Sequence, residues 1–389
     1  MAAKRGRSKP AARRKATKAA VVAPPVKPAL EQIRARIDDI DAQLHELINQ
    51  RAQLAQQVGI SKHAAGHTVD FYRPEREAQV LRMAVERNRS QRGPLRDEEI
   101  ARLFREIMSA CLAQQEPLKI AFLGPEGTFT QQAVLKHFGH SVRALPLTSV
   151  EEVFREVESG TADFGVVPIE NSSEGTVNNT LDMFLTSPLG ICSEVELRIH
   201  QNLMGRMTAL ADVQRVCAHA QALAQCRGWL AEHMTGVERV PVASNAEGAR
   251  RARDEEGTAA IAPMAAAEVY GLNVLVPEIE DRPDNTTRFL VVGRKSFPPS
   301  GQDKTTLLVS AAHTGAPGAL FRLLEPFATH GISMTRIESR PSRRRKWDYV
   351  FFIDLEGHAA VEPLVSALEE LKGQTSLCRI LGSYPRAIL

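Results

Sequence analysis

One long amphipathic stretch near the N-terminus, from Leu30 to about Ala65, constrains the fold more than any other feature. Its apolar residues recur at alternating steps of four and three, the spacing of one helix face; they are Ile33, Ile37, Ile40, Leu44, Leu47, Leu54 and Val58. Such a helix, at about 1.5 Å per residue, is about 50 Å long. Two shorter helical patterns follow, near Glu75–Asn88 and Asp97–Gln115. Because these cannot cover the long helix, we expect a second copy of the chain to do so, in an intertwined dimer.

The pattern changes after Pro117. Short apolar runs now alternate with helical stretches, which predicts an α/β region of two lobes with a cleft between them. The expected strands are Lys119–Leu123, Ser141–Leu145, Phe164–Pro168, Glu194–Ile199, Val213–Cys217, Glu238–Val242, Ala259–Ala262 and Arg288–Val292. The expected helices begin near Thr128, Val150, Ala220, Asn245 and Met264. A polar stretch, Ser296–Asp303, is predicted to be a linker.

The last segment, residues 304–389, has its own order of elements. The expected order is strand (Thr305–Ala311), helix (Gly318–His330), strand (Met334–Ser339), strand (Trp347–Leu355), helix (Val361–Leu371) and strand (Cys378–Ser383). This order is the split βαβ, ferredoxin-like plan of an α+β domain. The whole chain has 389 residues, of which 43% are hydrophobic and 24% charged. These values are typical of a soluble protein with two or three domains.

The charge is divided unevenly along the chain. Residues 1–28 hold nine of the 49 Lys and Arg residues and no acid, so we expect a disordered basic tail there. The other residues carry 40 basic and 46 acidic side chains. A body with this mildly acidic balance is not expected to bind nucleic acid, although the tail could contact phosphates.

Composition also bears on location and cofactors. No apolar run approaches the 18 residues of a membrane span. The five cysteines are scattered without a CxxC pair, which argues against a disulfide framework and a structural zinc site. We therefore expect a cytoplasmic protein that needs no metal or other cofactor.

Three cations interrupt the apolar face of the long helix. Arg51 stands where the stripe calls for Leu or Ile, and Lys62 extends the same stripe almost three turns later. Arg34 lies beside Ile33 at the edge of this face. Because a buried guanidinium needs a counter-charge, the three cations suggest a small polyanionic ligand. The plainer alternative is that Arg51 pairs with Glu46 or extends into water.

Three stretches in this region, IRARIDDIDAQLHELINQRAQLAQQVGISK, FYRPERE and RLFREIMSACLAQQ, resemble the all-helical type of chorismate mutase. The resemblance implies that Arg34 and Arg51 hold the two carboxylates of the substrate, one of them from the partner chain. It places Lys62 and Gln115 at the ether oxygen and Glu75 at the ring hydroxyl. A Claisen rearrangement agrees with this set, because it needs a folded substrate and donors at the ether oxygen rather than a nucleophile.

Two positions depart from that family pattern. Pro74 stands where some members carry an arginine, and the neighbouring Arg73 is a candidate replacement. Cys111 stands where others have a serine, so the contacts to the substrate ring differ there.

Three polar stretches stand out in the central region. Gly124–Thr130 (GPEGTFT) follows a strand and leads into a helix, so its backbone N–H groups could hold an anion. Glu170 and Asn171 end a buried strand and open a run of hydroxyls and amides. Thr287 and Arg288 precede another buried-looking strand. Taken singly, each also suits a tight turn, an exposed loop or a cross-strand pair.

Together these stretches resemble prephenate dehydratase over nearly the whole span 118–296, including the triplet Thr287-Arg288-Phe289. The resemblance implies two α/β lobes, like those of periplasmic binding proteins, with the active site between them. It makes Thr287 the residue most tied to catalysis and puts Glu170 and Asn171 in the site.

Three further side chains follow from this resemblance. Gln225 matches a glutamine of the cleft. Ala218 stands where some members have a serine, so the role of that hydroxyl is either absent here or taken over by Thr128 or Ser244.

The implied reaction expels hydroxide and CO₂ together as the ring becomes aromatic. The protein must assist the leaving hydroxyl while leaving the departing carboxylate poorly stabilised. Our hypothesis is that Thr287 orients the leaving group and that Arg288 holds a substrate carboxylate.

Two stretches of the last segment form a possible ligand site. Gly318-Ala319-Leu320 begins a helix, and Glu338-Ser339-Arg340-Pro341 ends a strand; both also suit an ordinary helix start and turn. The segment resembles an ACT regulatory domain of the dehydratase type. In that type, pairs of domains bind phenylalanine at their interface, which implies feedback inhibition.

The domains expected from these resemblances are a mutase at 29–117, a dehydratase at 118–296 and a regulatory domain at 304–389. They imply a homodimer or larger homo-oligomer that converts chorismate to prephenate and then to phenylpyruvate, with phenylalanine as inhibitor. A two-lobed sensory protein with helical and ACT dimerisation modules is the alternative. A dehydrogenase partner is disfavoured, because the sequence lacks a strand–GxGxxG–helix unit.

Overall fold

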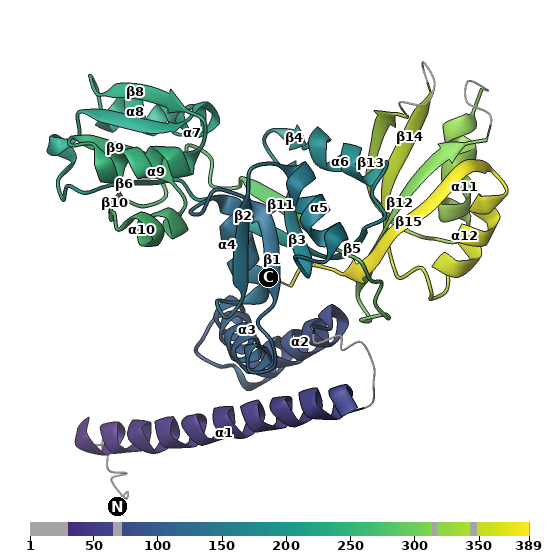
Figure 1. Ribbon diagram of the computed structural model, residues 1–389, viewed down its shortest axis with the longest axis horizontal. Coiled ribbons are helices and arrows are strands. Elements are labelled where there is room, and N and C mark those ends of the chain that lie inside the picture. Colours follow the sequence, from purple (N-terminus) through teal and green to yellow (C-terminus); the bar gives the residue numbers. More distant parts are fainter. Residues whose placement is uncertain (1–29, 65–71, 313–316, 343–347, 389) are drawn as a thin grey trace, which may run out of the picture. The chain divides into compact units, whose positions relative to one another are not determined.

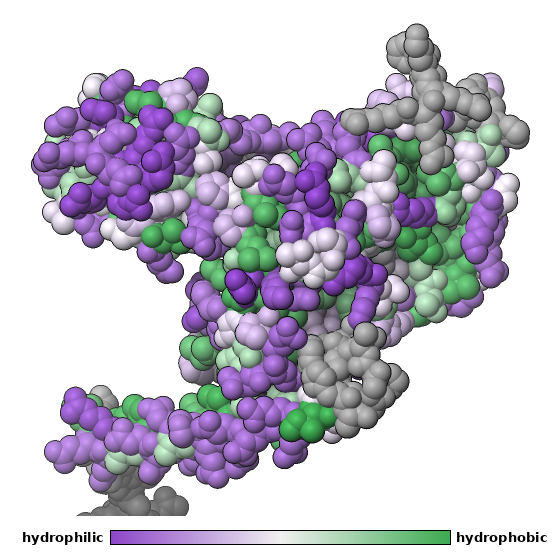
Figure 2. All heavy atoms as spheres, viewed as in Figure 1, coloured by the Kyte–Doolittle hydropathy of each residue, from purple (hydrophilic) through white to green (hydrophobic). Residues whose placement is uncertain are grey.

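The computed structural model describes residues 30–64, 72–312, 317–342 and 348–388 (Figure 1). The expected basic tail, residues 1–28, lies outside these residues, as does the side chain of Lys62. Helix α1 (Leu30–Ala64) is continuous over 35 residues, which confirms the expected long helix. The residues of its apolar stripe are exposed, and Leu44, for example, retains half of its accessible surface. In Figure 2 the visible face of this helix is mainly hydrophilic, with hydrophobic residues among the hydrophilic ones.

Two helices follow, α2 (Pro74–Gln91) and α3 (Asp97–Ala113), and they pack on each other. Pro74 occupies the first turn of α2, where a missing backbone N–H removes no helical hydrogen bond. The helix ends at Gln91, and Arg92 caps it in the left-handed conformation. Among the described residues, no helix is long and apolar enough to cross a membrane.

The first lobe contains a sheet in the order β2-β1-β3-β11-β5, with the short strand β4 paired to β3. Strands β1 (Lys119–Leu123), β2 (Arg143–Leu147) and β3 (Phe164–Asn171) are parallel. Strand β11 (Thr286–Gly293) runs antiparallel to β3 and β5 (Gly190–Arg198). The other elements of this lobe are β4 (Gly175–Thr176), α4 (Phe129–Phe138), α5 (Val150–Ser159) and α6 (Asn178–Phe184).

The second lobe contains a sheet in the order β10-β6-β9-β7-β8. Its strands are β6 (Asn202–Gly205), β7 (Arg215–His219), β8 (Glu238–Val242), β9 (Thr258–Ala262) and β10 (Asn273–Val276). Its helices are η1 (Leu210–Asp212), α7 (Ala220–Gln225), α8 (Arg227–His233), α9 (Asn245–Asp254) and α10 (Met264–Tyr270). The chain enters this lobe after β5 and returns to the first lobe with β11, which confirms the expected two-lobed α/β region (Figure 1).

The C-terminal domain has an antiparallel sheet in the order β13-β14-β12-β15. Its elements are β12 (Asp303–Ala311), α11 (Ala319–Thr329), β13 (Met334–Pro341), β14 (Tyr349–Glu356), α12 (Leu364–Lys372) and β15 (Thr375–Pro385). This is the expected split βαβ order. The two faces of the sheet bury different neighbours: Leu307 of β12 joins the core under α11 and α12, whereas Leu308 joins a core shared with the first lobe.

The expected linker, Ser296–Asp303, is a packed segment at its end, which corrects the prediction. Ser300 and Asp303 are buried, and Asp303 already belongs to β12. The Asp303 carboxylate accepts hydrogen bonds from the backbone N–H groups of Ser300 and Gly301, so this polar turn can leave water. Arg82 of α2 also donates to the Ser300 carbonyl at 3.0 Å.

Strand β15 lies directly on β5 of the first lobe. A side chain at Gly382 would collide with the Ile191 carbonyl, so glycine is required for this close approach. The C-terminal domain and the first lobe are therefore joined by backbone contact as well as by a common apolar core.

Candidate active sites

A cavity of about 310 Å³ lies between the two lobes, within the range of small-molecule sites. Its wall includes ends of β1, β3, β7 and β11 and the starts of α4 and α9. The lining residues are Leu123, Gly124, Thr128, Phe129, Thr130, Asn171, Ile199, Gln201, His219, Gln221, Ala222, Gln225, Ala243, Ser244, Asn245, Asn285 and Thr287. Five residues of the predicted site are thus together: Thr128, Asn171, Gln225, Ser244 and Thr287.

Asn171 and Thr287 face each other across β3 and β11. Asn171 Nδ2 donates to Thr287 Oγ1 at 2.8 Å, and Asn171 Oδ1 accepts from the backbone N–H groups of Ser173 and Glu174. These two backbone donors fix the orientation of the amide. Because the Thr287 oxygen accepts a hydrogen bond, its own O–H can donate into the cavity.

Thr128 and Ser244 cap two helices that begin at the cavity, one from each lobe. Thr128 Oγ1 accepts from the Gln131 N–H at 3.4 Å at the start of α4. Ser244 Oγ accepts from the Glu247 N–H at 3.1 Å at the start of α9. Free N–H groups and the helix dipole favour an anion at both ends. The cavity is therefore suited to a ligand with negative charge on both sides.

Gln201, which our sequence reasoning missed, lies beside Gln225 in the cavity. Gln201 Nε2 donates to Gln225 Oε1 at 3.0 Å. Gln201 is 3% exposed, and its Oε1 lacks a hydrogen-bond partner within the described part of the chain. An unsatisfied buried carbonyl is unfavourable, so a ligand hydroxyl in the cavity would stabilise it. In the sequence, Gln201 is marked only as a polar residue between two apolar runs, at the point where the chain passes from the first lobe to the second.

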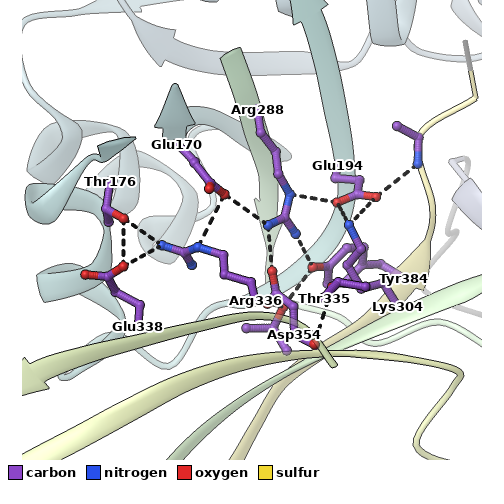
Figure 3. Close-up of polar contacts among 12 residues, drawn as sticks. Glu170, Thr176, Glu194, Arg288, Lys304, Thr335, Arg336, Glu338, Asp354 and Tyr384 are labelled. Atoms are coloured by element: carbon purple, nitrogen blue, oxygen red, sulfur yellow. Dashed lines mark hydrogen bonds and ion pairs between the residues drawn. The ribbon is translucent and has the colours of Figure 1, made fainter. Parts of the chain in front are cut away.

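Glu170 and Arg288, which we expected in the site, are not among the residues that line this cavity. Each is adjacent to a cavity residue, and successive side chains of a strand point to opposite faces. The Arg288 guanidinium donates to Glu194 Oε2 at 2.8 Å and to Asp354 Oδ2 at 2.6 Å. Glu170 Oε2 lies 3.3 Å from Arg336 Nε. Both side chains thus face the C-terminal domain (Figure 3).

The protonation of Arg288 follows from this setting. Burial lowers its pKa, but Tyr384, Asp354 and Glu194 outweigh burial and raise it overall. Arg288 is therefore a permanent cation whose charge is already balanced by neighbouring carboxylates.

A second cavity, of about 450 Å³, lies where the end of α1 meets α2 and α3. Arg51 and Gln115 line it, as predicted for a polyanion site, and Arg73, Arg76 and Arg105 add three more cations. The full set of lining residues also includes Ala55, Val58, Tyr72, Glu77, Val80, Met108, Ser109, Leu112, Ala113, Leu118, Phe138, Ser141 and Val142. The excess of arginine over acid leaves this cavity electropositive.

Gln115 and Glu75 have partners within the chain. Gln115 Nε2 donates to the Ala55 carbonyl of α1 at 2.8 Å. Glu75 is buried, and its Oε1 accepts from Arg73 Nε at 2.6 Å. Among the described residues, Glu75 Oε2 has no hydrogen-bond partner. Arg73, the candidate replacement for the arginine missing at Pro74, therefore pairs with Glu75. Glu75 itself does not line the cavity of the single chain.

A buried cluster joins this region to the first lobe. Tyr72 OH lies 2.9 Å from His137 Nε2 of α4. Burial, with a smaller effect of Arg105, lowers the pKa of His137 to about 3. Burial also raises the pKa of Glu77 to about 7, although Arg105 opposes it.

The possible effector residues lie on two elements of the C-terminal domain. Gly318, at φ +74°, precedes α11, and Ala319 and Leu320 form its first turn. Glu338 and Arg340 lie on the edge strand β13 with Ser339 between them, and Pro341 ends it.

The side chains of Glu338 and Arg340 reach the first lobe. Thr176 Oγ1 donates to Glu338 Oε2 at 2.9 Å, and Arg340 Nη1 donates to Asn178 Oδ1 at 2.9 Å. These two residues therefore contact the dehydratase-like lobe of their own chain. We found no group of three His, Cys, Asp or Glu poised for a metal in the described ranges.

Comparison with known proteins adds three tandem family matches. They are chorismate mutase type II at residues 33–116, prephenate dehydratase at 120–297 and the ACT domain at 305–373. A bifunctional chorismate mutase/prephenate dehydratase of Pseudomonas aeruginosa is 53% identical over 365 residues, covering 92% of this chain and 98% of that protein.

Two solved structures are similar over 69% of this chain. One is the prephenate dehydratase of Arthrobacter aurescens in complex with L-Phe, with 40% identity, 90% of that chain covered and a TM-score of 0.64. The other is GqqA, described as a novel type of quorum-quenching acylase, with 33% identity, 98% of that chain covered and a TM-score of 0.64.

Proposed function

The chain belongs to the bifunctional chorismate mutase/prephenate dehydratase family, and we propose that its two cavities carry the two consecutive reactions. Chorismate rearranges to prephenate at the cavity lined by Arg51 and Gln115. Prephenate loses CO₂ and water at the cavity between the lobes and gives phenylpyruvate. The boundaries that we assign are 29–117 for the mutase, 118–296 for the dehydratase and 304–389 for the regulatory domain.

The contact between Asn171 and Thr287 carries the dehydratase proposal. Asn171 Nδ2 holds the Thr287 oxygen as an acceptor, so that the Thr287 O–H donates to the leaving hydroxyl of prephenate. The C–O bond breaks with its electron pair, and the ring carboxylate leaves as CO₂ while its electron pair enters the ring. The leaving hydroxide takes up one proton from the solvent and becomes water, while Thr287 keeps its own proton.

The rest of the cavity orients the substrate in this proposal. The helix starts at Thr128 and Ser244 hold the carboxylate of the side chain. Gln225 and Gln201 also line the cavity, and Gln201 Oε1 accepts from the same hydroxyl that Thr287 assists, since prephenate has one hydroxyl. Arg288 is not assigned to the substrate, because its guanidinium already donates to Glu194, Asp354 and Tyr384.

For the mutase we propose that Arg51, Lys62 and Gln115 bind chorismate and stabilise charge at the ether oxygen, with Glu75 at the ring hydroxyl. Arg34 lies 17 residues before Arg51 in the same helix. At about 1.5 Å per residue this is roughly 25 Å, too far for both to reach one small ligand from a single helix. A second α1, in a homodimer or larger assembly, supplies Arg34 and covers the exposed apolar stripe.

We further propose that phenylalanine binds the C-terminal domains at Gly318–Leu320 and Glu338–Pro341 and inhibits the enzyme. The related dehydratase of Arthrobacter aurescens was solved with L-Phe, which supports this assignment. A cytoplasmic location fits the two proposed reactions.

A coupled assay tests the proposal: phenylpyruvate is measured from chorismate and, separately, from prephenate. R51A should abolish turnover of chorismate while leaving turnover of prephenate intact. T287A should collapse turnover of prephenate while leaving the mutase intact, and T287S, which keeps the hydroxyl, should retain much of it. Full dehydratase turnover in T287A would refute the catalytic assignment. Binding of prephenate without any turnover in the native protein would instead favour a sensory protein.

A further inference from the structure

Strands β3 and β11 separate two kinds of residue onto their two faces. Asn171 and Thr287 face the cavity, whereas the preceding Glu170 and the following Arg288 face the C-terminal domain. Glu170 and Arg288 are opposite each other in the strand register. Asn171 and Thr287 are therefore each bonded directly, through one peptide bond, to a residue whose charged side chain contacts the C-terminal domain.

The Arg288 side chain is the centre of these contacts (Figure 3). Its Nη1 donates to Asp354 of β14, and its Nη2 donates to Tyr384 OH of β15 at 3.0 Å. Its Nε donates to Glu194 of β5, which also accepts from Lys304 Nζ at 2.7 Å. The side chains of Asp354 and Glu194 are 2% and 1% exposed. A displacement of Asp354 that keeps these groups out of water would therefore leave a buried charge unpaired, so the positions of Asp354 and Arg288 are linked.

A second set of contacts comes from the edge strand β13. Arg336, Glu338 and Arg340 alternate along it and so share one face. Arg336 contacts Glu170, Glu338 accepts from Thr176, and Arg340 donates to Asn178. The polar segment that follows Asn171 is thus held by the strand that carries Glu338–Pro341, which we propose to bind phenylalanine.

We propose that Arg288 is a positioning residue, which transmits the state of the C-terminal domain to Thr287 through its bonds to Asp354 and Tyr384. This inference rests on the proposed dehydratase and its inhibition by phenylalanine. A shift of β14 and β15 pulls the Arg288 backbone, and Thr287 moves with it because the peptide bond between them is rigid. The 2.8 Å contact between Asn171 and Thr287 then changes, and a displacement of about 1 Å near the reacting atoms can reduce turnover about 100-fold.

The test uses the full-length chain with the substitution D354N, which removes one charge and keeps the side-chain shape. We expect phenylalanine to bind, by calorimetry, within about threefold of the native affinity. The phenylalanine concentration for half-inhibition of the dehydratase should rise at least tenfold, or the maximal inhibition should fall below half. Turnover of chorismate to prephenate should be unchanged, which reports an intact fold.

D303N is the matched control. Asp303 is also a buried acid of the C-terminal sheet, but its carboxylate accepts from Ser300 and Gly301 rather than from Arg288. We expect D303N to keep native inhibition. Y384F, which removes only the hydroxyl that accepts from Arg288, provides a milder second test and should weaken inhibition to a smaller extent.

Native inhibition in both D354N and Y384F would overturn the coupling. So would a loss of inhibition that merely follows a loss of phenylalanine binding. A native protein without dehydratase turnover, or without any response to phenylalanine, would instead refute the proposed function on which the coupling rests.

Discussion

Burial of the His137 side chain makes the stability of the chain sensitive to acid. His137 lies in α4 of the first lobe, and Tyr72 directly precedes the helical hairpin of α2 and α3. Burial, assisted by the charge of Arg105, lowers the pKa of His137 from 6.5 to about 3. The folded chain therefore keeps this imidazole neutral at pH values where the unfolded chain protonates it.

The magnitude follows from that difference in pKa. Between pH 6.5 and 3 the unfolded state binds more protons than the folded state, so the free energy of unfolding falls as the pH falls. One proton gives at most about 1.4 kcal/mol per pH unit. Between pH 7.5 and 4.5 this side chain alone should remove about 2.5 kcal/mol of stability.

The substitution H137Q isolates this effect, because glutamine can still accept from Tyr72 but does not titrate. Unfolding in urea, followed by circular dichroism at fixed protomer concentration, gives the free energy of unfolding of both proteins at pH 7.5 and 4.5. The difference between them should move in favour of H137Q by about 2.5 kcal/mol on acidification. The carboxyl groups are common to both proteins and cancel. Equal acid sensitivity of the two proteins would show that His137 is not buried neutral at this junction.

Three further predictions concern single side chains. Because burial raises the pKa of Glu77 to about 7, the folded state binds more protons than the unfolded state between pH 4.5 and 7, and stability falls as pH rises. E77Q should thus gain stability over the native chain on going from pH 4 to pH 8 in the same urea assay, and a constant difference would contradict this. Q201M should lower kcat/KM for prephenate about 10- to 100-fold, the value of one buried hydrogen bond of about 1–3 kcal/mol, without changing mutase turnover; native kcat/KM would remove Gln201 from the site. L44D places a charge in the exposed stripe of α1 and should convert the proposed dimer to monomer in sedimentation while abolishing mutase turnover. An unchanged mass would exclude this stripe from the proposed interface.

Elements with a strong local period were predicted well. Helix α1 ends within one residue of the expected bounds, and strands β1 and β8 coincide with theirs. Strands β4, β6 and β10 and helix α6 were missed, because they are short and α6 begins with polar residues, Asn178 and Asn179. Pattern alone does not separate such segments from loops.

The site shows a similar division. Thr287, Asn171, Gln225, Thr128 and Ser244 were expected in one cleft from their resemblance to a known family, and they line one cavity. Gln201 could not be chosen by its type, because what distinguishes it is an oxygen left unpaired by its surroundings.

Glu170 was expected in the site by resemblance, and Arg288 was expected to hold a substrate carboxylate. The structure does not place either of them among the residues that line the cavity. Strand β3 extends through Asn171, and β11 begins at Thr286, so the alternation of the pleat turns both side chains away from their neighbours in the cavity wall.

Resemblance to known families supplied the chemistry expected at each cavity, while periodicity and turn residues determined the long helix and the changes of pattern between the three modules. These depend on backbone geometry within a few residues, which the chain carries wherever it folds. The tertiary structure decided what each charge meets: Arg288 finds Glu194, Asp354 and Tyr384 on three different strands, 94, 66 and 96 residues away. Such pairings depend on which strands become neighbours in the folded chain. Local sequence does not specify these neighbours, and the buried charges must find their partners when the domains pack together.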